Sequence, residues 1–364
     1  MNNELRLLIS ARDAGAAHHL APVAKLALQT PGITLSLIAS EPALGLLRAQ
    51  GLDPSPVEHQ ADSLRASARS QLAQHHPDAV LVGLSGPDAG IDEALLAEAQ
   101  VPTFALQDFW GDVNPGFGRY ADTYLVRDRL AAELTRQRSG AACLVTGSPT
   151  ANAAPDALQQ QLLAQRLRDR LRIDRTTPLM LLCSQPLWQQ AGYAQSLRDA
   201  LQQLPQGLLL VRQHPRESAA DRHRLRRLLQ NHCRTPWRID DSPLPQQLAG
   251  AQLVVSAFSN TGLDRVHYNR AAPGNAASPL FLLQQPKLRR LFRDWTGLAQ
   301  HPLVSLRAAC GIQRKGQLSP QLGAALTAKK RRQCAQKARG LNPTPSAAAE
   351  ILAAVSQHLH HRAA

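Results

Sequence analysis

Several residue types and segments that would identify a class of protein are scarce in this sequence. Aromatic side chains make up 4% of the 364 residues, and the five cysteines are scattered and never spaced as C-x-x-C. This pattern excludes a disulfide framework or a cysteine-based zinc site, and it is typical of a reducing compartment. No apolar run reaches transmembrane length, and the run near the N-terminus is too short for a signal peptide. We therefore expect a soluble, cytoplasmic protein.

Motifs for metal-dependent and nucleophilic chemistry are also missing. There is no H-E-x-x-H and no D-x-D pair after a strand, and His18-His19 and His75-His76 are adjacent rather than one helical turn apart. Neither G-x-S-x-G nor G-x-G-x-x-G occurs. We expect no metal site and no required cofactor.

Acidic residues are few relative to basic ones. The 41 Lys and Arg exceed the 27 Asp and Glu, which gives a net charge of +14. Such an excess attracts anions, including nucleotides, anionic lipid and nucleic acid. Most arginines are expected on solvent-exposed faces of helices. Only residues 328–340, "AKKRRQCAQKARG", form a concentrated basic run. Through this run we expect peripheral contact with an anionic membrane, and nucleic-acid binding is the weaker alternative.

Strand-like and helix-like segments alternate along almost the whole chain. Such alternation predicts an α/β protein with two doubly wound parallel-sheet domains, over residues 1–150 and 151–340, joined through a small, polar linker at 147–157. A C-terminal helix follows over residues 341–364, and one arrangement packs this helix against the first domain. We expect strands at 5–10, 33–39, 79–84, 102–106, 122–126, 143–146, 178–184, 207–212, 237–239, 252–258 and 279–283, and one long helix over 319–338.

Polar loops follow several strands of the first half, where parallel sheets bind ligands. In "SARDAGAAHH", Arg12 and Asp13 are placed to project from a helix start at which Gly15 permits close approach of a phosphate. Asp13 is a candidate base, with helix capping as the alternative. Asp88 in "GLSGPDAG" has the same two interpretations. In "QDFWGD", Asp108 and Trp110 are candidate substrate contacts, and the alternative is an ordered loop that only covers the cleft. The candidates in this half are Arg12, Asp13, Gly15, Asp88, Asp108 and Trp110.

Two loops of the second half form the stronger pair. "LLLVRQHPRE" ends a buried strand on Arg212 and His214, which suit a phosphate and proton transfer, although a surface turn is the alternative. "SAFSNTGLD" crowds hydroxyl groups at a strand-to-helix transition, where free amides and the helix dipole favour a phosphate. An ordinary cap by Ser259 is its alternative. The candidates here are Ser256, Ser259, Asn260, Thr261, Gly262 and Asp264, the last for a ribose hydroxyl.

These loops resemble those of the GT-B superfamily, in which two Rossmann-like domains face a central cleft. "SARDAGAAHHLAPVAKLAL", "VPTFALQD" and "VTGSPTANA" are similar to segments of UDP-N-acetylglucosamine 2-epimerase-like proteins. The His-Pro loop and the Ser/Thr-rich loop are similar to those of surface-polysaccharide transferases that use CMP-sugars or CDP-glycerol. The chain departs from the epimerases where they carry G-D-T, E-A-G and S-G-G, since it has S-G-P-D, L-Q-D and S-N-T-G-L-D.

The resemblance implies a metal-independent glycosyltransferase that moves a sugar from a UDP- or CMP-sugar to a glycan or lipid acceptor. His214, Arg212 and residues 259–262 would hold the donor phosphate, and Asp13 or Asp88 would be the base. The first alternative is an epimerase or hydrolase of sugar nucleotides, with Asp88 and Asp108 as acid and base. The second is a non-catalytic nucleotide- or glycan-binding protein on the same scaffold.

Overall fold

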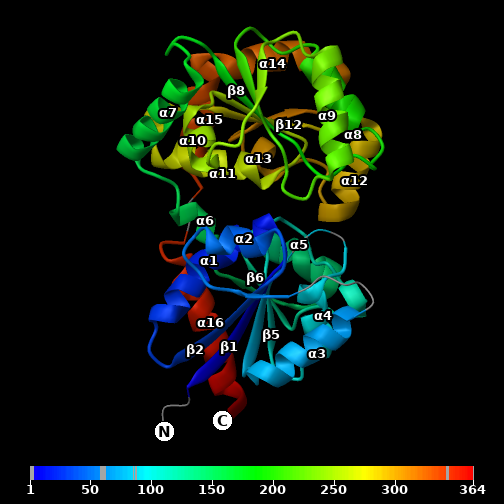
Figure 1. Ribbon diagram of the computed structural model, residues 1–364, viewed down its shortest axis with the longest axis vertical. Helices are drawn as coiled ribbons and strands as arrows, with labels where there is room; N and C mark the ends of the chain where they lie inside the picture. The colour runs from blue at the N-terminus through cyan, green and yellow to red at the C-terminus, as the bar shows by residue number, and fades with distance from the viewer. Residues whose placement is uncertain (1–3, 58–62, 85, 87, 342–343, 364) are drawn as a thin grey trace. The chain divides into compact units, whose positions relative to one another are not determined.

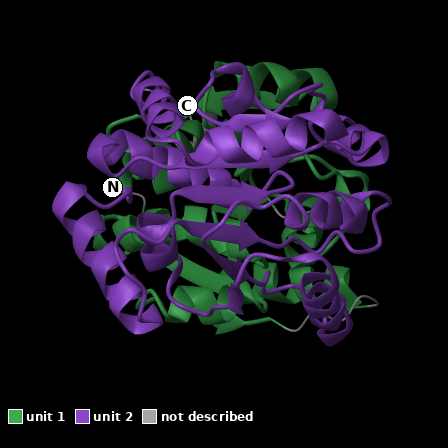
Figure 2. Cartoon of the chain, turned by 90° about the horizontal axis from the view of Figure 1, so that it is seen from above, with its two compact units in different colours: residues 1–152, 343–364 green, residues 153–342 purple. Residues whose placement is uncertain are grey.

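The chain folds into two units, which we describe separately from a computed structural model. The structure describes residues 4–57, 63–84, 86, 88–341 and 344–363. Unit 1 comprises Met1–Asn152 and Pro343–Ala364, and unit 2 comprises Ala153–Asn342 (Figure 2). Unit 1 is thus built from both ends of the sequence.

Unit 1 contains a seven-stranded sheet in which every pair of neighbouring strands is parallel. The strand order is β3-β2-β1-β4-β5-β6-β7. Its inner strands are almost continuous apolar runs, as expected for a parallel sheet covered on both faces. The strands are β1 (Leu5–Ala11), β2 (Ile33–Ala39), β3 (Ser55–Pro56), β4 (Ala79–Gly83), β5 (Thr103–Leu106), β6 (Thr123–Val126) and β7 (Ala142–Val145).

Helices lie on either side of this sheet (Figure 1). Helix α1 packs against α2 and the C-terminal α16, whereas α3 packs against α4. Ile351, Leu352 and Val355 of α16 are buried in the same core as the apolar face of α1. Burial of each such side chain stabilises the folded state by about 1.5–3 kcal/mol. The helices are α1 (Ala14–Gln29), α2 (Ala43–Arg48), α3 (Leu64–His75), α4 (Ile91–Glu98), α5 (Arg129–Ser139), α6 (Pro149–Asn152) and α16 (Ala347–Ala363).

Unit 2 contains a six-stranded sheet, also parallel throughout, in the order β10-β9-β8-β11-β12-β13. Its strands are β8 (Leu179–Cys183), β9 (Leu208–Arg212), β10 (Trp237–Ile239), β11 (Leu253–Ser256), β12 (Ser278–Leu282) and β13 (Cys310–Ile312). Its helices are α7 (Ala157–Leu171), α8 (Tyr193–Leu201), α9 (Ala219–His232), α10 (Leu244–Gly250), α11 (Asn260–Ala271), α12 (Pro286–Thr296), α13 (Pro302–Ser305), α14 (Leu318–Leu326) and α15 (Ala328–Ala338).

The structure corrects the expected elements in a few places. The single helix expected over 319–338 is two helices, because Thr327 adopts an extended backbone and its side chain accepts from the Lys330 amide, which starts α15. The expected linker at 147–157 contains the short α6. Three further elements were not predicted from the sequence because they are too short for a hydrophobic period to show, namely β3, α13 and β13.

The strand orders indicate where each sheet is expected to bind a ligand. In unit 1 the chain winds outward in one direction from β1 and in the other from β4, and in unit 2 the same reversal lies between β8 and β11. Open α/β sheets bind ligands outside the carboxyl ends of the strands at such reversals. No helix within the described residues is long and apolar enough to cross a membrane.

Candidate functional site

In unit 1, the loop after β1 brings two carboxylates together. Asp13 caps α1, since its Oδ1 accepts from the Ala16 amide at 3.0 Å. A Cβ atom at Gly15 would collide with the Asp108 carboxylate and would lie 3.4 Å from Asp13 Oδ1. Gly15 therefore permits Asp108, from the loop after β5, to approach the first turn of α1 beside Asp13.

Asp108 has an environment that favours its protonated form. Burial is the main reason that its pKa is well above the ordinary value, and the negative charges of Asp13 and Asp112 raise it further. Asp112 is buried in the same loop. A proton retained on Asp108 next to Asp13 is the arrangement expected of an acid and base pair. From the sequence, Asp108 was expected to contact the substrate or, in the epimerase alternative, to act in an acid and base pair with Asp88 rather than with Asp13.

Trp110 is enclosed by its neighbours. Its side chain is 3% exposed, its indole Nε1 donates to Asp128 Oδ2 at 2.9 Å, and the Arg127 guanidinium carbon lies 4.3 Å from the ring centroid. A cation over the face of an indole is a favourable contact. Arg127, which no sequence pattern indicated, thus covers the ring that we expected to meet a substrate.

The Arg12 side chain bonds to the segment between β4 and α4 and to the first turn of α4. Its Nε lies 3.2 Å from Glu93 Oε2, and both side chains are almost fully buried. Its guanidinium also donates to the carbonyl oxygens of Gly86 and Asp88. Asn114 reinforces this cluster, since its Nδ2 donates to Glu93 Oε1 and to the Gly86 carbonyl, both at 2.7 Å. Asp88 itself is exposed, so Arg12 fixes the segment that carries Asp88.

A further buried carboxylate lies under this cluster. Asp92 Oδ1 accepts from the Ser10 hydroxyl at 2.5 Å. Burial is the main reason that its pKa is raised to about 8, with the charge of Glu93 adding to the effect. From the sequence, Asp92 and Glu93 were expected only as part of a helix. Only their neighbours Ile91, Ala94 and Leu95, which are all buried, could have indicated an enclosed position.

In unit 2, the loop after β9 orients His214. Its backbone amide donates to Glu217 Oε2 at 2.9 Å. Its ring Nδ1 accepts from the Arg216 amide at 3.1 Å, so in the neutral ring the proton is on Nε2. Glu217 also accepts from Ser184 and Trp188, at 2.6 Å each. No sequence pattern had indicated a role for Glu217, Ser184 or Trp188.

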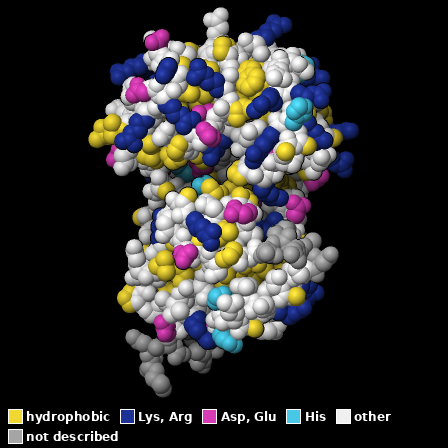
Figure 3. All heavy atoms as spheres, in the orientation of Figure 1, with side chains coloured by type: hydrophobic (Ala, Val, Ile, Leu, Met, Phe, Trp, Pro, Cys, Tyr) yellow, Lys and Arg dark blue, Asp and Glu magenta, His cyan; other side chains and the backbone are white. Residues whose placement is uncertain are grey.

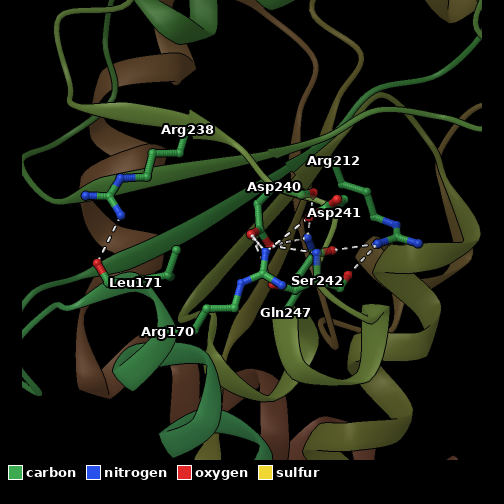
Figure 4. Close-up of polar contacts among 8 residues, drawn as sticks. All are labelled: Arg170, Leu171, Arg212, Arg238, Asp240, Asp241, Ser242 and Gln247. Carbon is green, nitrogen blue, oxygen red and sulfur yellow. Dashed lines mark hydrogen bonds and ion pairs between the residues drawn. The ribbon is translucent and has the colours of Figure 1, made fainter.

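Arg212 is anchored by residues that follow β10 (Figure 4). Its Nη1 donates to the Ser242 carbonyl and to Gln247 Oε1, both at 3.0 Å. Gln247 in turn donates to Asp240 Oδ2 at 2.7 Å, and Asp240 pairs with Arg170 at 2.6 Å. This network joins the ends of β9 and β10 to α7 and α10, so it fixes the place of Arg212 at the sheet edge.

The loop after β11 is a compact cluster of hydroxyl groups at the start of α11. Ser256 Oγ accepts from the Ser259 amide at 3.2 Å. Ser259 caps α11 by accepting from the Thr261 amide at 3.2 Å, and the two hydroxyl oxygens lie 3.1 Å apart. Capping by Ser259, the alternative considered from the sequence, is therefore present, and the hydroxyl cluster lies at the positive end of the α11 dipole.

The remaining candidates of this loop lie on α11 itself. Asn260 and Asp264 are half-buried. A Cβ atom at Gly262 would lie 2.6 Å from Phe281 Cζ on β12, and real Cβ atoms do not approach so closely. Gly262 therefore has a packing role, namely close contact between α11 and the sheet.

The end of β8 joins the His214 loop to the hydroxyl loop. Ser184 Oγ donates to Glu217 Oε2. The same hydroxyl oxygen accepts from the His214 amide at 3.3 Å. Gln185 Oε1 accepts from the Phe258 amide at 3.0 Å. Because β8 lies between β9 and β11, these bonds bring His214 and the Ser259–Thr261 segment to one edge of one sheet. The sequence signal for this loop was only its place after the first strand of unit 2.

Candidate metal ligands do not gather in the described part of the chain: no group of three His, Cys, Asp or Glu side chains that could hold an ion occurs there.

Comparisons with known proteins identify the fold. The sequence matches no protein-family model and no curated protein. The UDP-GlcNAc 2-epimerase from Neisseria meningitidis bound to UDP-GlcNAc is 13% identical with a TM-score of 0.68, over 97% of this chain and 100% of that chain. The S. aureus MnaA–UDP structure is 14% identical with a TM-score of 0.68, over 98% and 97%. A glycosyltransferase from Rickettsia africae ESF-5 is 10% identical with a TM-score of 0.62, over 98% and 99%.

These similarities confirm the fold class and the resemblance predicted from the sequence. The chain has a GT-B-like fold with two parallel-sheet α/β units.

Proposed function

We propose that this chain is a GT-B glycosyltransferase that uses a nucleotide-sugar donor and a glycan or lipid acceptor. The observation that carries the proposal is the hydrogen-bonded convergence of His214 and the Ser259–Thr261 segment at the carboxyl ends of β8, β9 and β11. This is the edge at which a doubly wound sheet binds its ligand. The convergence supplies N–H and O–H donors, which suit a phosphate.

In the proposed reaction, these donors stabilise the charge that develops on the departing nucleotide phosphate. His214 donates from Nε2, the hydroxyl groups of Ser259 and Thr261 donate alongside, and the α11 dipole favours the anion. Arg212 at the end of β9 adds a fixed positive charge, and Asp264 is assigned to the ribose. Protein groups provide this stabilisation, so the proposal requires no resident metal or cofactor.

Unit 1 provides the acceptor base in this proposal. Asp13 is favoured over Asp88 because it lies beside Asp108, whose raised pKa favours its protonated form. A carboxylate next to a protonated carboxyl group can accept the proton of a hydroxyl group without a second negative charge beside it. Asp88, held by its backbone in an exposed position, is the second candidate.

The donor proposed first is a UDP-sugar, because two structures with similar folds are described as containing UDP or UDP-GlcNAc. CMP-sugars are the alternative donor class.

Epimerisation or hydrolysis of a sugar nucleotide is the second candidate function, and the named epimerase among the similar folds favours it. From the sequence, Asp88 and Asp108 were the expected acid and base for this chemistry. The contacts of Gly15 instead favour Asp13 and Asp108 as its acid and base. A binding protein without catalysis is the third candidate.

Turnover assays distinguish the three functions. Purified protein is incubated with UDP-GlcNAc and other sugar nucleotides, with and without glycan or lipid extracts, and free nucleotide and sugar products are measured. A transferase releases nucleotide in an acceptor-dependent manner. An epimerase or hydrolase forms an epimer or releases UDP without an acceptor. Binding of a sugar nucleotide with no turnover under any condition would contradict both enzymatic proposals.

We also propose that α15 contacts anionic membrane surfaces. Lys329, Arg332, Lys337 and Arg339 are exposed on or directly after this helix, and the sequence between Asp294 and Glu350 contains no acidic residue. Each such cation near an anionic surface contributes about 1 kcal/mol.

A further inference from the structure

Glu217 joins three segments around the proposed phosphate site. It is 4% exposed, and both of its carboxylate oxygens accept hydrogen bonds. Oε2 accepts from the Ser184 hydroxyl at 2.6 Å and from the His214 amide at 2.9 Å. Oε1 accepts from the Trp188 indole at 2.6 Å. One buried carboxylate therefore connects the end of β8, the loop that follows it and the turn after β9.

The same turn determines the orientation of the His214 ring. The Glu217 amide donates to the His214 carbonyl at 3.0 Å, which closes the turn, and the Arg216 amide donates to His214 Nδ1 at 3.1 Å. Since Glu217 holds the backbone of His214 and the turn holds its ring, movement of the Glu217 carboxylate would shift both.

We infer that Glu217 is a positioning residue whose carboxylate, held by Ser184 and Trp188, fixes the turn that presents His214 to the donor phosphate. This inference rests on the proposed function, which assigns phosphate binding to His214. It adds a residue that acts through His214 without touching the substrate.

The donors around Glu217 explain why a carboxylate is needed. The His214 amide and the Trp188 indole can only donate, and they bond to different oxygens of Glu217. Glutamine has the same shape but only one acceptor oxygen. In Glu217→Gln, therefore, either the amide of His214 or the indole of Trp188 must face an NH2 group. A residue that merely filled space would tolerate this isosteric change.

The test compares wild type, Glu217→Gln, His214→Ala and the control Glu133→Gln, which changes an exposed glutamate on α5. The ligand is whichever of UDP, CMP, CDP and GDP binds the wild type, titrated by calorimetry. Imidazole 15N NMR reports the His214 tautomer, and fluorescence, referenced to Trp188→Phe, reports the Trp188 contact. We expect Glu217→Gln to weaken nucleotide binding at least tenfold and to alter the His214 ring signal, with Glu133→Gln matching the wild type.

The possible outcomes separate this inference from its premise. Full nucleotide affinity in His214→Ala would overturn the proposed function, and the inference with it. Weakened binding in His214→Ala with normal binding or an unchanged His214 signal in Glu217→Gln would overturn the inference alone.

A second variant applies if Glu217→Gln does not fold. The double variant Ser184→Ala with Trp188→Phe removes two donors from Glu217 and leaves the carboxylate in place. We expect it to weaken nucleotide binding about threefold to tenfold and to shift the His214 signal, and wild-type values for both would overturn the inference.

Discussion

At the scale of residues, buried ionisable groups distinguish the strand ends of this chain from its surface. In unit 1, burial raises the pKa of Asp108 and Asp92, and in unit 2 burial raises that of Glu217, although its hydrogen-bond donors oppose the shift. Such shifts gather at functional sites because acid–base chemistry requires them, although structural clusters produce them too. The two classes are separable by experiment, since a structural group changes stability and a catalytic group changes turnover.

The raised pKa of Asp92 can be tested through the pH dependence of the free energy of unfolding. Its folded pKa is about 8, whereas the pKa of an unfolded aspartate is about 3.9. Between these values the folded state holds a proton that the unfolded state has lost, so stability falls as pH rises. Relative to Asp92→Asn, the wild type should lose up to about 1.4 kcal/mol of unfolding free energy per pH unit in this range, levelling off above the folded pKa.

The measurement is urea unfolding of both proteins at several pH values between 5 and 9, with Asp53→Asn as a control for loss of an exposed charge. A difference between wild type and Asp92→Asn that does not change with pH would refute the assigned shift.

At the scale of elements, close packing against a helix decides which of its glycines can be replaced. Gly262 in α11 and Gly323 in α14 are both helical, but a Cβ atom at Gly262 would meet the Phe281 ring, whereas one at Gly323 would meet nothing within 4 Å. The two positions therefore differ in whether a neighbouring side chain would meet the added Cβ atom.

Alanine substitution at these glycines should have opposite effects. Gly323→Ala should raise the unfolding free energy by about 0.5–1 kcal/mol, because alanine loses less backbone entropy in a helix. Gly262→Ala should lower it by about 1–3 kcal/mol through overpacking against Phe281. Chemical denaturation measures both, and equal stabilisation by the two substitutions would show that the contact with Phe281 does not constrain α11.

Most strands and helices were predictable from the sequence because apolar runs and helical periods extend over five residues or more. The boundary at Thr327 was not, since its cap interrupts an otherwise continuous helical pattern. The loops after β1, β9 and β11 were predictable as site candidates because small and polar residues follow buried strands. Glu217 and Arg127 were not, because their importance depends on contacts with Trp188 and Trp110 that no local pattern encodes.

At the scale of the whole molecule, charge is divided between the units. Unit 2 carries 29 of the 41 Lys and Arg but 10 of the 27 Asp and Glu. Basic side chains are spread over the face of unit 2 seen in Figure 3. A field of one sign over one unit raises the local concentration of anions there, which agrees with a nucleotide site in unit 2.

The proposed membrane contact through α15 predicts salt-sensitive binding to anionic vesicles. Replacing Lys329, Arg332, Lys337 and Arg339 by Gln should weaken sedimentation with phosphatidylglycerol vesicles more than tenfold, because each cation contributes about 1 kcal/mol. The control removes four exposed arginines of α9 instead. Equal losses in both variants would indicate a general charge effect, and no binding by the wild type would exclude the contact. The control substitutions are Arg222, Arg224, Arg226 and Arg227 to Gln.

The central claim is that the strand ends of unit 2 bind the phosphate of a nucleotide through His214. A thermal-shift titration with UDP, CMP, CDP and GDP tests it directly on the wild type, His214→Ala and His223→Ala, the last an exposed histidine of α9. Nucleotide at about 100 times its dissociation constant adds about 2.7 kcal/mol of stability. We predict this stabilisation for the wild type and His223→Ala and its loss in His214→Ala. No stabilisation of the wild type by any of the four nucleotides, or equal stabilisation of all three proteins, would contradict the claim.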